Sequence, residues 1–213
     1  MTRWATFDCY GTLIDWNGGI GAVLARVFGA ARADEQLRRY HELEPELEAD
    51  GTLRYREVMT EAMRRLGAPP DEEQALAGSL PDWQPFPEVR ESLEEARRRG
   101  WRLAILSNTD PDYIEASKGL IGVPFEETVT ASEIGSYKPA LGHWREFSAR
   151  TGAGPGRHVH VAASLFHDIA PANELGLASV WINRLGERPG PRPSRELSDL
   201  RGLADVLDSL VSE

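Results

Sequence analysis

The stretch Trp4-Ala-Thr-Phe-Asp-Cys-Tyr-Gly-Thr-Leu-Ile-Asp15 decides the fold of this chain. The apolar run Ala5–Phe7 predicts a short buried strand that ends at one acidic residue, Asp8. Gly11-Thr12 then turns the backbone away from the strand. A carboxylate at the carboxyl end of a parallel strand stands where α/β folds place their ligand and active sites. The stretch therefore predicts an α/β fold with its chemistry at Asp8.

Tyr10, two residues after Asp8, bears on the kind of chemistry. A Mg²⁺-dependent phosphotransferase with this pattern would need a second carboxylate at that position, because Mg²⁺ is held almost wholly by oxygen ligands. The chain supplies a phenol there instead. This difference favours a displacement at an aspartate that does not involve phosphate.

Length and composition restrict the remaining possibilities. The chain has 213 residues, enough for one core and a modest insertion, and 41% hydrophobic with 27% charged residues indicates a globular protein. Lys and Arg number 24 and Asp and Glu 34, so the net charge of −10 argues against nucleic acid and anionic membranes as partners. No apolar run approaches the roughly 20 residues that span a bilayer. Cys9 is the single cysteine, so we expect a small buried thiol, no disulfide and a cytoplasmic location.

The pattern of apolar runs and helical periodicity predicts a doubly wound parallel sheet covered by helices on both faces. Four strands are expected, at Ala5–Phe7, Arg102–Leu106, Val159–Ala162 and Ser179–Ile182. The predicted helices of this α/β part are Glu88–Arg99, Leu141–Thr151, Ile169–Leu175 and Leu197–Val211, with a further helix start at Thr109-Asp-Pro111. The segment Gly186–Ser194, rich in Pro, Gly and Arg, predicts a surface loop.

Between the first two strands the sequence breaks this alternation. Four consecutive helices are predicted there, at Gly21–Phe28, Asp34–Ala49, Leu53–Leu66 and Asp71–Gly78, followed by a stiff return over Pro81–Pro87. We therefore expect an α/β core formed by residues 1–15 and 87–213, with residues 16–86 inserted as a helical cap.

Polar residues at the predicted strand ends form one constellation, and their chemistry can be argued from the residue types. Asp8 can attack a carbon atom and form an ester. Lys138 can keep Asp8 ionised and attract an anionic substrate. Ser107, with nearby backbone N–H groups, can hold a substrate carboxylate, and the Asn108 amide can stabilise a departing anion. Asp168 can orient or deprotonate a water molecule.

Three motifs carry a resemblance to a known family. Phe7-Asp-Cys-Tyr-Gly-Thr-Leu13, Leu106-Ser-Asn108 and Tyr137-Lys-Pro139 resemble motifs of the haloacid dehalogenase superfamily. Tyr10 together with Ser107-Asn108 is similar to its L-2-haloacid dehalogenase branch. The helical insertion and Trp181-Ile-Asn-Arg184 extend the resemblance over the whole chain.

The resemblance implies a Rossmann-like core with a cap, a 2-haloacid substrate, no cofactor or metal, and a homodimer. It implies Asp8 as the nucleophile, supported by Thr12 and Ser107, with Lys138 as charge partner, Asn108 in the halide site and Asp168 activating water. Tyr10 and Trp144 would line the cleft. A cap arginine would approach the halide, for which Arg38 and Arg39 are available and Arg39 fits the register better.

The chain also departs from this branch, which commonly has a serine and an asparagine five and three residues before the last aspartate. Ala163 and Leu165 occupy these positions here. Two alternatives stay open: another hydrolase of the superfamily, either a residual phosphatase or an enzyme for an unknown acid, and a binding or regulatory member without catalysis. His158 and His160 alternate along a predicted strand without further ligands at metal spacing, so we expect structural roles for them. His167 is expected to be solvated or to orient Asp168.

Overall fold

A computed structural model describes residues 2–49, 51–188 and 190–212. Its centre is a six-stranded sheet in which all neighbouring strands are parallel, in the order β3-β2-β1-β4-β5-β6. The strands are β1 (Arg3–Phe7), β2 (Trp101–Ser107), β3 (Glu127–Thr130), β4 (His158–Ala162), β5 (Ala178–Ile182) and β6 (Arg195–Leu197). The predicted doubly wound α/β fold is confirmed.

The strand order creates a switch point between β1 and β4. From β1 the chain adds β2 and β3 on one side, then crosses to add β4, β5 and β6 on the other. In the register of the sheet, Phe7 lies between Ile105 of β2 and Val161 of β4. A crevice opens at the carboxyl ends of strands where the winding direction reverses, and ligands of doubly wound folds bind there. Asp8 directly follows β1 at this point.

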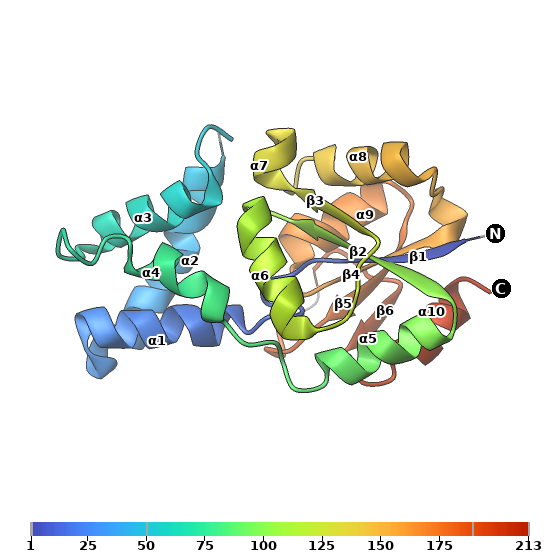
Figure 1. The fold of residues 1–213 in the computed structure, drawn as a ribbon, viewed down its shortest axis with the longest axis horizontal. Helices are drawn as coiled ribbons and strands as arrows, with labels where there is room; N and C mark the ends of the chain where they lie inside the picture. Colours follow the sequence, from blue (N-terminus) through green and yellow to red (C-terminus); the bar gives the residue numbers. More distant parts are fainter. Residues whose placement is uncertain (1, 50, 189, 213) are drawn as a thin grey trace.

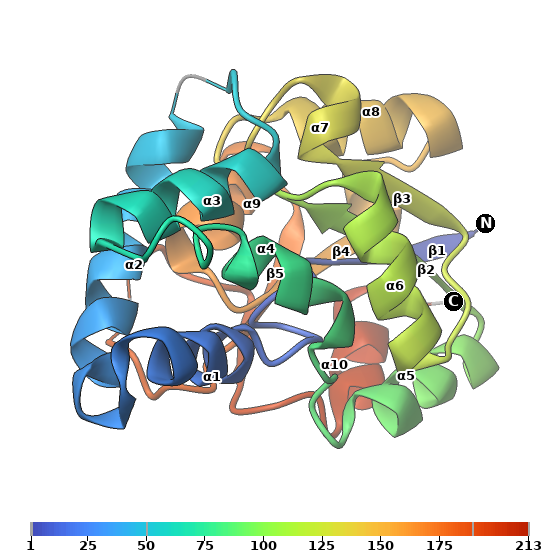
Figure 2. The ribbon, with the colours of Figure 1, turned by 60° about the vertical axis from the view of Figure 1, so that its left-hand side comes forward.

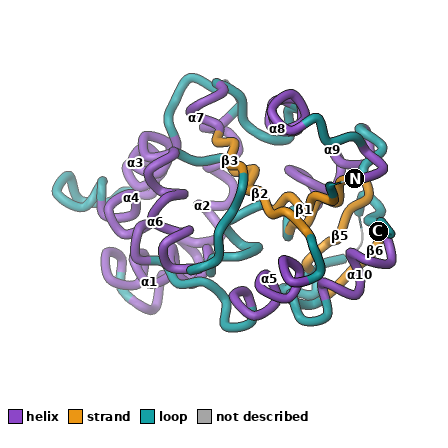
Figure 3. The backbone as a smooth tube through the Cα atoms, turned by 45° about the vertical axis from the view of Figure 1, so that its right-hand side comes forward, coloured by secondary structure: helices purple, strands orange, loops and turns teal. Residues whose placement is uncertain are grey.

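Helices cover both faces of the sheet, as Figure 3 shows. On one face lie α5 (Val89–Arg98), α6 (Pro111–Ile121) and α10 (Leu203–Leu210), and on the other α8 (Gly142–Thr151) and α9 (Ala170–Glu174); the short α7 (Ala131–Ile134) follows β3. Side chains of β1 alternate between these layers: Ala5 and Phe7 join the first core cluster, whereas Trp4 packs against Phe147 of α8 in the second. Burial of both faces explains the near-continuous apolar runs of the strands.

Four further helices lie between β1 and α5 in the sequence: α1 (Trp16–Phe28), α2 (Ala33–Glu48), α3 (Tyr55–Leu66) and α4 (Ala75–Ser79). Figure 1 shows them together beyond the end of the sheet where β1 ends, and Figure 2 shows the same group from its own side. We call α1–α4 the cap helices. Their apolar faces pack on one another through residues such as Leu24, Tyr40 and Met59. The division of the chain into a core and a cap at residues 16 and 86 stays a prediction.

The structure corrects several predicted elements. Strands β3 and β6 and helix α7 were not predicted, because these elements are short and β6 is an edge strand with mostly exposed side chains. The predicted helix Leu197–Val211 begins only at Leu203, since Leu197 pairs with Ile182 and the chain turns at Gly202 with φ of 76°. The predicted loop Gly186–Ser194 contains residue 189, which lies outside the described residues.

The remaining predicted helices are found with shifted ends. The predicted helix over Ile169–Leu175 is α9, and a π-helical turn over Leu165–Ile169 precedes it. Helix α1 begins five residues before the predicted Gly21, at Trp16, where the Asp15 side chain accepts a hydrogen bond from the Gly18 N–H. Among the described residues, no helix has both the length and the apolar character that a bilayer crossing requires.

Candidate active site

Asp8 is held from two sides at the end of β1. Its backbone N–H donates to the Val161 carbonyl at 3.1 Å, which continues the pairing with β4. The Thr12 hydroxyl donates to Asp8 Oδ2 at 2.8 Å and accepts from the Ala163 N–H at 2.9 Å. Gly11, with φ of 87°, lets the chain fold back so that Thr12 reaches Asp8. The carboxylate is therefore fixed, yet 13% of its side chain remains accessible.

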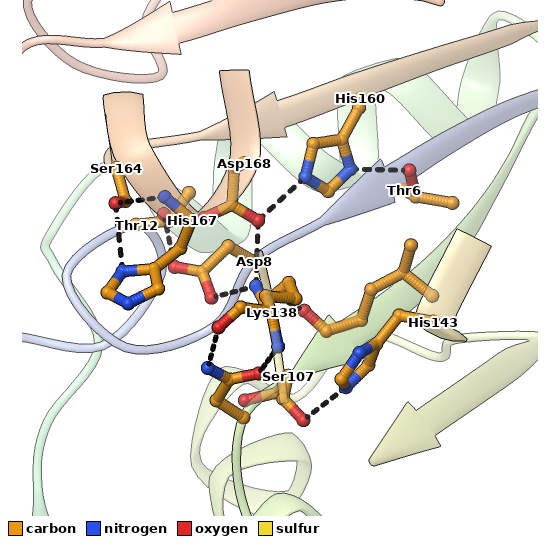
Figure 4. Close-up of polar contacts among 12 residues, drawn as sticks. Thr6, Asp8, Thr12, Ser107, Lys138, His143, His160, Ser164, His167 and Asp168 are labelled. Carbon is orange, nitrogen blue, oxygen red and sulfur yellow. Dashed lines mark hydrogen bonds and ion pairs between the residues drawn. The ribbon is translucent and has the colours of Figure 1, made fainter. Parts of the chain in front are cut away.

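The Lys138 ammonium group binds both site carboxylates. Nζ donates to Asp8 Oδ1 at 2.9 Å, to Asp168 Oδ1 at 2.7 Å and to the Leu106 carbonyl at 2.9 Å, so all three of its protons are used (Figure 4). The side chain is 1% exposed, and the peptide between Lys138 and Pro139 is cis. The loop before α8 thus delivers a cation to the point where β1, β2 and β4 end.

Asp168 lies in the π-helical turn Leu165–Ile169 that follows β4. Its Oδ1 atom accepts from Lys138 and also from His160 Nε2, at 2.9 Å. Its Oδ2 atom is buried and has no hydrogen-bond partner in the part of the chain that the structure describes. π-Helical turns are frequent at functional sites. One oxygen of Asp168 is therefore fully bonded and the other is available.

Burial and charge act differently on the three ionisable groups. Burial raises the pKa of Asp8 above its ordinary value, and the charge of Lys138 offsets this only in part. Burial also opposes the charge of Asp168, but Lys138 and the His160 hydrogen bond outweigh it and hold the pKa of Asp168 well below its ordinary value. Burial alone would lower the pKa of Lys138, yet the charges of Asp168 and Asp8 raise it. Lys138 is therefore charged at neutral pH, and Asp168 ionises before Asp8.

A cavity of about 630 Å³ opens over these groups. The core contributes the ends of β1, β2 and β4 and the cap helices contribute α1, α2 and α3; the lining includes Asp8, Tyr10, Ser107, Lys138, His167, Asp168, Trp16, His41, Glu44, Glu48 and Tyr55. A second hollow of about 980 Å³, between α3, α4 and α6, contains none of these groups, and its charged lining is engaged in ion pairs such as those of Arg56 with Asp112 and of Arg64 with Glu61. We therefore take the cavity of about 630 Å³ as the candidate active site.

The cap wall of the cavity carries two buried carboxyl groups, Glu44 and Glu48. The phenols of Tyr55 and Tyr40 donate to Glu44 Oε1 at 2.7 and 3.2 Å. Burial raises the pKa of Glu44 to about 7. Burial and the neighbouring Glu44 raise the pKa of Glu48 well above its ordinary value. Near neutral pH the carboxyl group of Glu44 is therefore partly protonated.

The structure places most of the predicted site residues in this cavity. Ser107 ends β2, is 1% exposed and lines the cavity. Asn108 lines the cavity, but its amide protons are already donated to Glu48 Oε2 at 3.1 Å and to the Lys138 carbonyl at 3.0 Å. Asn108 therefore fixes the Lys138 loop and can bind an anion only if the bond to Glu48 breaks. Tyr10 also lines the cavity, with its hydroxyl 3.0 Å from Ser117 Oγ.

Two predicted site residues lie elsewhere. Trp144 is buried in the second core cluster, where its ring packs edge-on against His160 with centroids 5.2 Å apart, and it does not line the cavity. Arg39 is exposed, as is Arg38, because the face of α2 that turns inward carries Tyr40, Glu44 and Glu48. The structure places neither side chain at the cavity, and the predicted roles of Trp144 and Arg39 at the site stay predictions. Whether Arg39 or Trp144 reaches the cavity depends on which face of its helix turns towards the cavity. The sequence alone does not determine that orientation.

Comparison with known proteins now adds to this geometry. The sequence profile of the haloacid dehalogenase-like hydrolase family matches residues 2–176. The chain belongs to this family. An (S)-2-haloacid dehalogenase of Pseudomonas sp. (strain YL) is 28% identical over 97% of this chain and 95% of its own length. A phosphoserine phosphatase of Thermus thermophilus is 31% identical over 68% of this chain and 61% of its own length.

Solved structures give the same fold. The L-2-haloacid dehalogenase of Xanthobacter autotrophicus, with chloropropionic acid covalently bound, superposes with a TM-score of 0.85 at 17% identity, over 99% of this chain and the whole of that one. At this identity the similarity establishes the fold. Because the superposition covers 99% of this chain, the shared fold includes the cap helices. The Trp181–Arg184 segment contacts the loop after Asp8, since Arg184 Nη2 donates to the Thr12 carbonyl at 2.8 Å.

Sequence reasoning missed the cap residues of this hydrolase and the partners of Asp168. Glu44 follows Tyr40 by four residues and Glu48 follows Glu44 by four, so all three lie along one face of α2. That spacing was a usable signal, because a polar stripe in register with a buried aromatic residue indicates an inward-facing site. Thr6 and His160 face each other in the sheet, which became visible only with the strand register.

Proposed function

We propose that the protein is an (S)-2-haloacid dehalogenase, which converts a 2-haloalkanoate to a 2-hydroxy acid and halide through an aspartyl ester. The single observation that carries this proposal is the bonding of Asp8: Thr12 and Lys138 hold its two oxygens, and the side chain still faces a cavity. A carboxylate so oriented can act as a nucleophile. The 28% identity with the Pseudomonas (S)-2-haloacid dehalogenase over nearly the whole chain supports the same assignment.

The first step is a displacement at carbon. An Asp8 oxygen attacks the carbon that bears the halogen from the side opposite to it, the C–O bond forms, and the halide leaves with the electron pair of the C–X bond. The configuration at that carbon inverts. Lys138 lowers the energy of the ionised nucleophile, and the Ser107 hydroxyl, which lines the cavity, can donate to the substrate carboxylate.

The second step is hydrolysis of the ester. Water attacks the carbonyl carbon of the Asp8 ester, and its proton passes to Asp168, whose Oδ2 has no other partner among the described residues. The bond between that carbonyl carbon and the ester oxygen breaks, and the alkoxide takes the proton from Asp168. Asp8 is left as a carboxylic acid and becomes a carboxylate again when it releases the other proton of the water to solvent. The product oxygen thus comes from Asp8.

The carboxyl groups of the cap wall affect the binding of an anionic substrate. A substrate carboxylate or a departing halide cannot lie beside an ionised Glu44 without repulsion. The raised pKa of Glu44, about 7, keeps that carboxyl group protonated below neutral pH, where it can donate a hydrogen bond. Below neutral pH, Glu44 can therefore offer the substrate a neutral hydrogen-bond donor at the place where the resemblance predicts a cap arginine.

The donor set does not fit the alternative of a Mg²⁺-dependent phosphatase. Mg²⁺ requires oxygen ligands in near-octahedral geometry. Tyr10 stands where a second carboxylate would be needed, Ala163 beside the site has no side-chain oxygen to offer, and the Lys138 ammonium lies between Asp8 and Asp168. Within residues 2–49, 51–188 and 190–212, no group of three or more His, Cys, Asp or Glu side chains is arranged to hold a metal ion.

The proposal is tested by halide release from the separate enantiomers of 2-chloropropionate, with chiral analysis of the lactate. We expect chloride from the S enantiomer, R lactate as product, and no loss on addition of EDTA. A metal-dependent phosphatase would instead hydrolyse p-nitrophenyl phosphate in an EDTA-sensitive way. Failure of all these substrates would favour the binding or regulatory alternative.

We propose in addition that the enzyme works in the cytoplasm as a homodimer. The location is supported by the single, buried and unpaired thiol of Cys9. The dimer is supported by the resemblance of the chain to the L-2-haloacid dehalogenase branch. Light scattering of the purified protein tests the dimer: a mass near 47 kDa, twice the 23.6 kDa of one chain, supports it and a mass near one chain contradicts it.

A further inference from the structure

A chain of hydrogen bonds leads from the active site into the sheet. His160 Nε2 lies 2.9 Å from Asp168 Oδ1, His160 Nδ1 lies 2.8 Å from Thr6 Oγ1, and Thr6 Oγ1 lies 2.6 Å from His158 Nε2. All four side chains are buried, with exposures of 0 to 2%. Figure 4 shows Asp168, His160 and Thr6 in line, with Asp8 beside them. We call Asp168, His160, Thr6 and His158 the relay.

The donor in each of these bonds follows from the side chains themselves. An ionised carboxylate only accepts, so His160 Nε2 carries the proton that faces Asp168. In the tautomer that carries its one proton on Nε2, His160 accepts at Nδ1, and the Thr6 hydroxyl donates to it. Thr6 has no second proton, so it accepts from His158 Nε2; burial lowers the pKa of His158 to about 3, which keeps that ring neutral. Each member thus fixes the tautomer or rotation of the next.

Rigid elements hold the relay in place. Thr6 and His160 are direct partners in the β1–β4 register, and His158 is two residues away on β4. On α8, Trp144 packs against His160 with ring centroids 5.2 Å apart, and Phe147 packs against His158 at 4.9 Å. These rings exclude water, and hydrogen bonds are stronger in such a low-dielectric setting. Trp144 therefore covers the relay rather than the substrate.

Asp168 depends on this relay because its own loop supplies no side-chain hydrogen-bond donor to it. Ala163 and Leu165 have no side-chain donor, and the Ser164 hydroxyl is engaged with His167, accepting from its backbone N–H at 3.0 Å. Apart from Lys138, which also serves Asp8, His160 is the one described side chain that bonds to Asp168. His160 is thus the partner that can set the rotation of the carboxylate and the direction of Oδ2.

We propose that His160, oriented by Thr6 and His158, is a positioning residue for the hydrolytic step. It holds Asp168 so that Oδ2 accepts the proton of the water that attacks the Asp8 ester. This inference rests on the proposed function, because it needs the ester. It concerns the second step alone, so loss of the relay should spare the displacement at carbon and slow the release of the hydroxy acid.

The test compares matched variants at His160 and at Thr6 with (S)-2-chloropropionate as the probe. His160→Gln places an amide N–H near the position of Nε2, whereas the shorter side chain of His160→Asn does not reach Asp168. Thr6→Val replaces the hydroxyl by a methyl group of similar size, and Thr6→Ser keeps the hydroxyl. Rapid mixing measures the chloride released in the first turnover, and mass spectrometry of the quenched protein measures the ester on the peptide that contains Asp8.

We expect His160→Asn to release the first chloride at close to the rate of the parent protein, to hydrolyse the ester about tenfold or more slowly, and to accumulate the ester. His160→Gln should restore hydrolysis to within about threefold of the parent rate. Thr6→Val should slow hydrolysis as well, and Thr6→Ser should not. The Thr6 pair carries the test if His160→Asn fails to fold.

Three outcomes would overturn the inference. Equal slowing of chloride release and hydrolysis in His160→Asn and Thr6→Val would mean a structural role only. Unchanged hydrolysis in both would mean that Asp168 needs no relay. In either case the parent protein still turns over, and the proposed function stands. No chloride and no ester with the parent protein would instead refute the proposed function, and the positioning role with it.

Discussion

The Nζ atom of Lys138 lies 2.9 Å from Asp8 Oδ1, and the lysine side chain is 1% exposed. The same atom bonds to Asp168 at 2.7 Å, so one cation is shared by two buried carboxylates. Removal of one member of a buried ionic group leaves an uncompensated charge and is strongly destabilising. The stability of the site and its chemistry therefore depend on the same ammonium group.

We expect Lys138→Met to abolish chloride release and to lower the free energy of unfolding at pH 7 by about 3–5 kcal/mol. The chain offers a control in its one other lysine, Lys118, which forms an exposed ion pair with Glu115. Lys118→Met should change stability by about 0.5 kcal/mol or less. Urea denaturation with both variants checks this, and similar losses for the two lysines would contradict the assignment.

The ionisation of Asp8 sets the acid limb of activity. Asp8 attacks only as a carboxylate, and burial raises its pKa, so kcat/KM should increase with pH through a value above the ordinary pKa of aspartate. The Thr12 hydroxyl lowers this pKa by donating to Oδ2. Thr12→Val should therefore move the acid limb to higher pH. Thr60, which bonds to a backbone carbonyl within α3, provides the control; an unmoved limb in Thr12→Val would count against the nucleophilic role of Asp8.

The raised pKa of Glu44 should make the free energy of unfolding depend on pH. Its pKa is raised by burial from an ordinary 4.5 to about 7. Below pH 4.5 the folded and unfolded chains both hold this proton, but between 4.5 and about 7 only the unfolded chain loses it, so stability falls as pH rises through this window.

Glu44→Gln removes that titration. The variant should gain stability relative to the parent by up to about 3 kcal/mol on going from pH 4.5 to pH 7.5. Glu42, exposed on the same helix, is the matched position for a Glu→Gln control. Thermal unfolding of both variants across this range measures the difference, and a constant offset for Glu44→Gln would show that the buried carboxyl group does not titrate there.

Arg39 is expected to be dispensable. Its side chain is exposed, and the inward face of α2 carries carboxyl groups instead. Arg39→Ala and Arg38→Ala should each keep kcat/KM for (S)-2-chloropropionate within about twofold, as surface changes usually do. A tenfold or greater loss in either variant would show that the cap moves and brings an arginine to the halide.

Part of the site could be predicted from the sequence, because those residues lie next to strands that are recognisable in the sequence. Asp8, Ser107 and Asp168 follow strands whose apolar runs are recognisable, and a parallel sheet brings strand ends to one edge. Lys138 is fixed by the loop that enters α8. The position of a side chain that directly follows a recognisable strand can therefore be predicted from the sequence.

The cap residues and Trp144 could not be placed in this way. One residue step along a helix turns the side chain by about 100°, so Arg39 and Tyr40 point in quite different directions. Only the packing of α2 on the other cap helices selects Tyr40, Glu44 and Glu48 as the inward face. Trp144 likewise faces the sheet because α8 lies on it. The exposed edge strand β6 lacked the apolar pattern on which strand prediction depends.

The central claim is that Asp8 forms a covalent ester, and a single turnover in ¹⁸O-labelled water tests it most directly. With enzyme in excess over (S)-2-chloropropionate, we predict one ¹⁸O atom in the peptide that contains Asp8 and unlabelled oxygen in the hydroxyl group of the lactate. Label in the lactate hydroxyl with an unlabelled Asp8 would show that water attacks the substrate carbon directly, and would contradict the account.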